Sequence, residues 1–128
     1  MREFTIRDQV YRLRPIDARK GLTLFKKGAL LYHGFAQGDE LQHWFPMLSQ
    51  LSEEDLTILE QVVVPLIDRQ IEGKKWAKIY EERTRTYLFQ DIESYDLLFF
   101  IKEGLFAVLP DFMACVLPKD LDLEAETE

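Results

Sequence analysis

The sequence predicts an α+β, mainly α fold, with an N-terminal β-hairpin, a compact bundle of about four helices and a disordered acidic C-terminal tail. Three observations predict it: alternating apolar residues near the start, apolar residues at helical spacing further along, and dense acidic residues at the end. The 128 residues are 47% hydrophobic and 30% charged, which suffices for one buried core. We therefore expect a single globular domain over residues 1–117 and a flexible acidic tail over residues 118–128.

The hairpin is predicted from residues 3–15. Phe4 and Ile6 alternate with polar residues before a short polar turn, and Tyr11 and Leu13 alternate after it. Period-two alternation on both sides of a turn is typical of two antiparallel strands. Pro15 should end the second strand, because proline has no N–H to donate to a neighbouring strand.

The first helix is predicted over residues 17–33. Asp17 is a suitable N-cap, because its carboxylate can accept hydrogen bonds from the free N–H groups of a first helical turn. Apolar residues then recur at spacings of three and four, and Gly34 is a suitable stop. Gly21 and Gly28 weaken a helix, so we expect another segment to pack closely against them.

Two further helices are predicted near the middle of the chain. A short one covers residues 41–51, with a kink near Pro46, and a longer one begins after Ser52. Three acidic residues follow Ser52 and favour the positive end of a helix dipole. Pro65 limits this helix. Residues 67–73 fit either a prolonged helix or an extended segment, and the sequence pattern does not fix the conformation of residues 65–93.

The last helix is predicted from about Ser94 to Leu109, and it is unusually apolar. Either the rest of the domain buries its whole surface, or the surplus binds a partner. On the second interpretation we name Trp76, Phe99 and Phe106 as candidate protein-binding residues. A second copy of the chain could also cover the surplus, which would make the protein a homo-oligomer.

Charge is distributed unevenly along the chain, although the net charge is −7. Residues 1–32 carry eight Lys/Arg and three Asp/Glu, whereas residues 33–117 carry seven and fifteen. Residues 118–128 add one Lys and five Asp/Glu. The overall sign opposes non-specific binding to nucleic acid, which depends on basic residues, so we predict no nucleic-acid partner.

No motif in the sequence indicates a catalytic, cofactor-binding or metal-binding site. His33 and His43 lack the carboxylate or thiolate neighbours, at fixed spacing, that a metal site needs. Cys115 has apolar neighbours, which disfavour a reactive thiolate. Lysines interleave with Trp76 over Lys74–Tyr80, where a core tryptophan between solvated lysines is the favoured interpretation over base stacking. We predict no enzyme activity, no cofactor and no metal.

The sequence also predicts a location. No apolar run approaches the ~20 residues of a membrane-spanning helix, and Met1–Phe4 lacks the apolar stretch of a signal peptide. A single cysteine allows no internal disulfide and suggests a reducing compartment. We therefore expect a cytoplasmic protein without a membrane partner.

Residues Tyr11–Lys20 read Tyr-Arg-Leu-Arg-Pro-Ile-Asp-Ala-Arg-Lys and precede a helix with Leu22, Phe25 and Leu30. This layout resembles the opening of small tail assembly chaperones of long-tailed bacteriophages, which are often similar in length, acidic and mainly helical. The resemblance covers residues 3–112. It implies a non-enzymatic chaperone that binds the tape measure protein during tail morphogenesis in the host cytoplasm, with the tail tube protein as a further partner. No binding residue of the family maps onto this chain by motif.

A small acidic regulator or inhibitor is the alternative function. The excess of acidic residues over residues 33–128 could occupy a basic site on a nucleic-acid enzyme. The basic first helix argues against a uniformly acidic surface. A complex of that kind should weaken steeply with salt, whereas an apolar complex should weaken far less.

Overall fold

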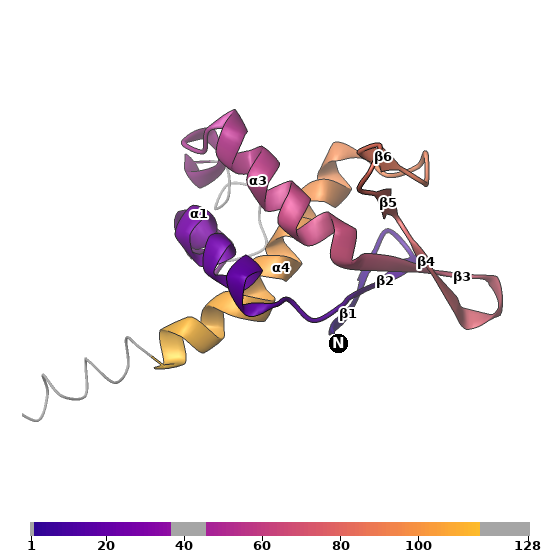
Figure 1. Ribbon diagram of the computed structural model, residues 1–128, viewed down its shortest axis with the longest axis horizontal. Helices are drawn as coiled ribbons and strands as arrows, with labels where there is room; N and C mark the ends of the chain where they lie inside the picture. Colours follow the sequence, from indigo (N-terminus) through magenta and orange to yellow (C-terminus); the bar gives the residue numbers. More distant parts are fainter. Residues whose placement is uncertain (1, 37–45, 116–128) are drawn as a thin grey trace, which may run out of the picture.

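The strands form two sheets in the computed structural model, which describes residues 2–36 and 46–115 (Figure 1). The larger sheet is antiparallel, with its strands in the order β1-β2-β3-β4. These strands are β1 (Arg2–Ile6), β2 (Gln9–Leu13), β3 (Ile67–Ile71) and β4 (Lys75–Lys78). The smaller sheet pairs β5 (Tyr80–Glu81) with β6 (Thr86–Tyr87).

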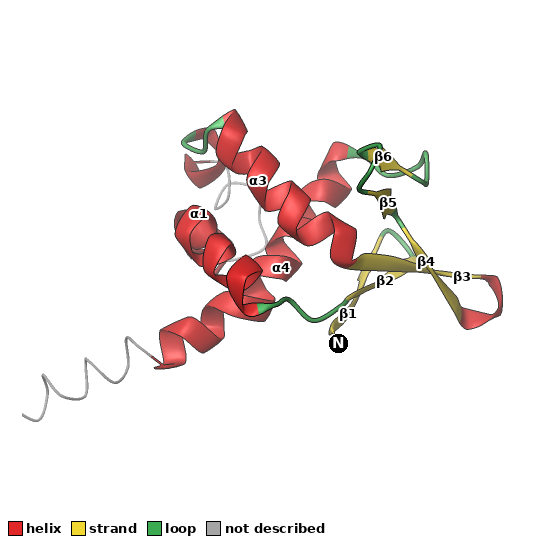
Figure 2. Ribbon diagram, viewed as in Figure 1, coloured by secondary structure: helices red, strands yellow, loops and turns green. Residues whose placement is uncertain are grey.

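The long helices gather at one side of the molecule and the strands at the other (Figure 2). The helices are α1 (Ala18–Ala36), α3 (Glu53–Val63) and α4 (Ser94–Cys115), and both α1 and α3 pack against α4. Residues 46–49 form a helical turn. Two 3-10 turns, Val64–Leu66 and Glu72–Lys74, lead into β3 and β4.

The predicted fold class, a hairpin followed by a bundle of about four helices, is wrong. The hairpin is present over residues 2–13, but β3 and β4 extend it into a four-stranded sheet. Both added strands come from residues 65–93, whose conformation the sequence pattern left open. β3 continues the ladder because Leu13 pairs with Ile67. The predicted acidic tail, residues 118–128, lies outside the described residues.

The turn of the first hairpin holds two residues with positive φ. The register ends at the pair Ile6 and Gln9, so Arg7 and Asp8 form a two-residue loop with φ of 47° and 69°. This is a type I′ turn, which suits the twist of the two strands but usually carries Asn or Gly. Arg7 and Asp8 therefore adopt a conformation that costs free energy for most side chains.

Two predicted helix starts are confirmed. The backbone N–H of Lys20 donates to Asp17 Oδ1 at 2.8 Å, and that of Asp55 donates to Ser52 Oγ at 3.0 Å. Both bonds satisfy donors that a helix leaves free at its N-terminus. α1 continues to Ala36, three residues beyond its predicted end at residue 33.

The core lies where α4 meets the sheet and the other two helices. Phe100 of α4 is fully buried, with its ring centroid 5.0 Å from that of Tyr11 and 6.1 Å from that of Phe4. Burying one phenylalanine contributes about 2–3 kcal/mol. A Cβ at Gly28 of α1 would overlap the side chain of Leu105 of α4. The close packing predicted at Gly28 is therefore confirmed.

α4 is longer and better covered than the sequence predicted. It continues through Pro110 to Cys115, six residues past the predicted end at Leu109. Proline removes one backbone donor but keeps a helical φ, so a helix can continue past it with one bond lost. Much of the apolar surface of α4 is core, including Phe100, Ile101, Leu105 and Leu109. Only the first turns of α4 line the groove described next.

Candidate functional site

An apolar groove of about 460 Å³ lies between α3 and the first turns of α4. It has contributions from three segments: the turn over residues 46–49, α3 and α4. The residues that line it are Leu48, Leu56, Glu60, Ser94, Tyr95, Leu97, Leu98 and Ile101. Six of these eight side chains are apolar or aromatic, so the groove suits an apolar ligand.

Helical spacing places these residues on one side of each helix. Leu56 and Glu60 are one turn apart on α3, and Ser94, Leu98 and Ile101 follow spacings of four and three on α4. Two helices that present such faces to the same space form the kind of groove that accepts an amphipathic helix.

Glu60 is the carboxylate among the lining residues, and Tyr87 of β6 fixes its position. The Tyr87 hydroxyl donates a hydrogen bond to Glu60 Oε2. Burial of the phenol, followed by this bond, raises the pKa of Tyr87 well above its usual range. The hydroxyl therefore stays protonated and keeps donating at neutral pH. The ring of Tyr80 packs against Tyr87, with centroids 5.0 Å apart.

Tyr95 is the aromatic residue among those that line the groove. Its side chain is 52% exposed, and its ring centroid is 4.8 Å from that of Phe99 on the next turn of α4. Leu88 has almost the same exposure, 51%, but does not line the groove. These two residues thus form a matched pair, one inside the groove and one outside it.

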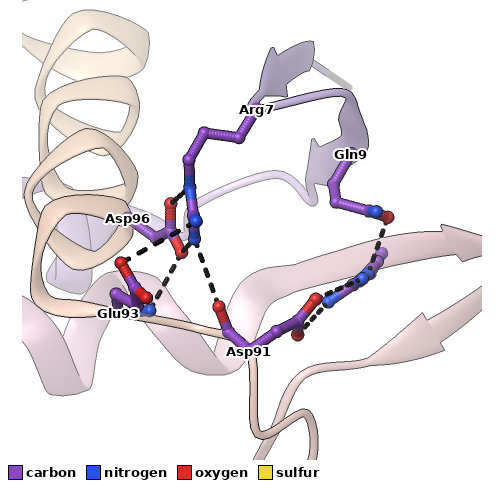
Figure 3. Close-up of polar contacts among 6 residues, drawn as sticks. Arg7, Gln9, Asp91, Glu93 and Asp96 are labelled. Carbon is purple, nitrogen blue, oxygen red and sulfur yellow. Dashed lines mark hydrogen bonds and ion pairs between the residues drawn. The ribbon is translucent and has the colours of Figure 1, made fainter.

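A network of charged side chains holds the N-terminus of α4, which carries one wall of the groove (Figure 3). Arg7, from the hairpin turn, donates to Asp96 at 2.5 Å and to the backbone oxygen of Asp91 at 3.1 Å. Asp96 also accepts from the backbone N–H of Glu93 at 2.9 Å. That bond completes half of a capping box at the start of α4.

The second half of the network joins β3 to the segment before α4. Arg69 donates two parallel bonds to the carboxylate of Asp91, at 2.7 and 2.9 Å, and one bond to Gln9 Oε1 at 3.0 Å. The bonds between Arg69 and Asp91 raise the pKa of Arg69 and lower the pKa of Asp91. Paired guanidinium and carboxylate groups of this kind fix position and do no proton chemistry.

The predicted binding residues lie on two elements. Phe99 and Phe106 are half-buried on α4, and the Nζ of Lys102 lies 4.9 and 5.7 Å from their ring centroids. The Phe106 ring also packs against Tyr32 of α1. Trp76 lies on the edge strand β4, where the Arg12 guanidinium covers its ring at 4.6 Å. None of the three lines the groove, although Phe99 touches Tyr95.

Sequence reasoning did not single out the residues that do line the groove. Leu97, Leu98 and Ile101 were part of the apolar pattern of the last helix, but periodicity cannot tell an internal face from an open one. Glu60 gave no signal of its own, because a carboxylate on a helix is most often simply solvated. The spacing of Leu56 and Glu60 shows that they share a face, not that the face borders a cavity.

A second cavity, of about 390 Å³, lies where the start of α1 faces the later turns of α4. Arg2 and Arg14 line it, but both already have partners. Arg2 Nε is 2.6 Å from Glu103, and Arg14 donates to the backbone oxygen of Pro65 at 2.6 Å. Arg14 Nε makes no hydrogen bond with the described residues, but it lies 3.4 Å from the carboxylate of Asp68. Since both arginines are paired with carboxylates of the protein itself, the apolar groove is the stronger candidate site.

Within residues 2–36 and 46–115, no group of three or more His, Cys, Asp or Glu side chains is placed to hold a metal ion. His33 is exposed in the last turn of α1, Cys115 is the last residue of α4, and His43 lies outside the described residues. No described helix is both long enough and apolar enough to cross a membrane.

Comparisons with protein-family models, curated proteins and solved structures find no significant match to this chain.

Proposed function

We propose that this chain is a non-enzymatic assembly chaperone that binds the tape measure protein of a long-tailed bacteriophage in the host cytoplasm. The observation that carries the proposal is the apolar groove between α3 and α4. A tape measure protein is long and aggregation-prone before the tail tube surrounds it, and its helices need apolar cover. The groove offers such cover in the helix-in-groove mode.

The resemblance of Tyr11–Lys20 to the opening of tail assembly chaperones supports the same proposal. In the structure this segment is not itself the groove. It holds most of β2 and the start of α1, which pack on the sheet and on α4. Its place in the fold supports a scaffolding part, with contact to the client made by α3 and α4.

Co-expression with a segment of the candidate tape measure protein tests the proposal. The variants are Tyr95→Asp, which puts a charge in the groove, and Leu88→Asp, which puts a charge on an equally exposed site outside it. The client should be soluble with wild type and with Leu88→Asp, and should aggregate with Tyr95→Asp. Circular dichroism shows whether each variant is folded. A client that stays soluble with folded Tyr95→Asp contradicts the proposal.

A further inference from the structure

We infer that the groove between α3 and α4 binds an amphipathic helix whose polar residues beside the apolar face are basic. This inference deepens the proposed function, and it rests on that function only for the identity of the client protein. It is drawn from the charges around the groove.

α3 carries four carboxylates and no basic residue. Glu53, Leu56 and Glu60 follow spacings of three and four, so both glutamates share the face of α3 that borders the groove. Asp55 is already paired with Lys27 of α1, at 3.1 Å. Glu53 and Glu60 have no basic partner among the described residues.

On the α4 side, Lys102 follows Leu98 by one turn, but it is buried with its Nζ over the rings of Phe99 and Phe106 and does not line the groove. Arg7, in the network before α4, is paired with Asp96 at 2.5 Å and with Glu93 at 3.7 Å. Glu93 itself is 68% exposed, just before the first groove residue of α4. No Lys or Arg occurs among the described residues that line the groove.

The position of Glu60 favours a basic helix over an acidic one. Its carboxylate is half-buried beside apolar side chains, and Tyr87 satisfies one of its oxygens. A carboxylate that a ligand covers without a cation loses hydration and gains nothing in return. A helix with Lys or Arg one turn from its apolar anchors would pair with Glu60 and Glu53. An acidic helix would be repelled by both.

Two synthetic peptides test the inference by fluorescence anisotropy with the full chain. Both are amphipathic helices of about five turns with the same leucine face, and their polar residues are either all Lys or all Glu. The Lys peptide should bind at least about ten-fold more tightly than the Glu peptide at low salt. Added salt should reduce the difference in affinity between the two peptides, because it screens the exposed carboxylates.

Glu60→Gln is the variant that isolates the charge, since the amide oxygen still accepts the Tyr87 bond. It should weaken binding of the Lys peptide about five-fold and leave a peptide with Gln at the same positions unchanged. Glu82→Gln, on the exposed loop between β5 and β6, is the matched control and should change neither. Equal affinity for Lys and Glu peptides, or no effect of Glu60→Gln, overturns the inference.

The outcomes separate this inference from the proposed function. Binding of the Lys peptide without any effect on a co-expressed tape measure segment keeps the inference and contradicts the function. A tape measure segment that stays soluble, although the chain binds no peptide, keeps the proposed function and contradicts the inference. Sedimentation of the chain alone measures its oligomeric state, and so tests whether a second copy occupies the groove. A dimer that Tyr95→Asp dissociates would overturn the inference.

Discussion

Arg7 Nη2 lies 2.5 Å from Asp96 Oδ2, so the turn of the first hairpin is bonded to the first turn of α4, 89 residues further along the chain. The contact does two things at once. It keeps Arg7 in its positive-φ conformation, and it orients the carboxylate that caps α4 through the Glu93 N–H. The position of the groove wall on α4 therefore depends on a residue of the N-terminal hairpin.

Asp96→Ala should lower the free energy of unfolding by about 2–4 kcal/mol, because it removes a helix cap and leaves the bonds of Arg7 unmade. Asp96 is only 1% exposed, so water does not replace its bond to the Glu93 N–H, whereas the Arg7 side chain is 48% exposed and water can partly hydrate it. Asp96→Asn keeps an oxygen for the Glu93 N–H and should lose roughly half as much. Urea unfolding measures both values. A loss under about 1 kcal/mol for the alanine variant would show that the network has little energetic weight.

Asp8→Gly should raise stability by about 0.5–1 kcal/mol, because glycine adopts the φ of 69° without the steric cost of a side chain. Gly73 gives the reverse case. Its φ is 74° and a Cβ added there would meet no atom within 4 Å, so Gly73→Ala should cost about 1 kcal/mol from backbone conformation alone. Thermal unfolding should show a raised midpoint for Asp8→Gly and a lowered midpoint for Gly73→Ala. Shifts of both midpoints in the same direction would contradict the positive φ of these two residues as the cause.

Gly104→Ala should destabilise the protein by about 1–3 kcal/mol, even though alanine favours a helix. A Cβ at Gly104 would lie 2.5 Å from Val63 Cγ2 of α3, and the branched valine cannot turn aside. Gly28→Ala meets the flexible end of Leu105, so it should cost less. Denaturant midpoints rank the two variants. A greater loss for Gly28→Ala would mean that α4 has more freedom against α3 than this packing suggests.

Acid should weaken the link between β3 and the segment before α4. Arg69 holds the pKa of Asp91 below its usual value near 3.8, so the ionised carboxylate stabilises the fold above that pH. This contribution is lost as the pH falls through the lowered pKa of the native state. Asp91→Asn should therefore be less stable at pH 7 and should lose less stability between pH 5 and 3 than wild type. Urea midpoints across this range test the prediction, and parallel curves for both proteins would refute it.

The sequence predicted the parts of the fold that depend on local pattern. Alternation around a polar turn identified the hairpin, and the residue types at Asp17 and Ser52 identified two helix starts. Each of these features is decided within a few neighbouring residues. The ends of α1 and α4 were less well predicted, because packing against other elements carries a helix past a weak stop signal.

The sequence pattern left β3 open between helix and strand, and two of its five residues are charged and yet buried. Asp68 and Arg69 interrupt the alternation of apolar residues by which a strand is recognised in a sequence. Partners from distant segments make their burial tolerable. Arg12 Nε lies 2.8 Å from Asp68, and Arg69 pairs with Asp91. A single sequence shows the charges without the partners.

The groove was beyond sequence reasoning for a related reason. It depends on the angle and separation of α3 and α4 and on the turn that carries Leu48, none of which has a local signature. The apolar excess of the last helix was visible, but its division between core and groove was not. Size and composition favoured Phe99, Phe106 and Trp76, whereas the groove is built mainly from leucines.

The link between Arg7 and Asp96 also sets the order of events during translation. At ~5–20 residues per second, a ribosome takes roughly 4–18 s to add the 89 residues that separate them. An isolated two-stranded hairpin is at best marginally stable in water, so β1 and β2 cannot hold their sheet structure alone in that interval. Phe4 and Tyr11 reach their shared neighbour Phe100 only after α4 has begun to emerge. The hairpin is synthesised well before α4 and is thus among the last parts of this fold to become stable, so its aromatic side chains stay exposed to other nascent chains until then.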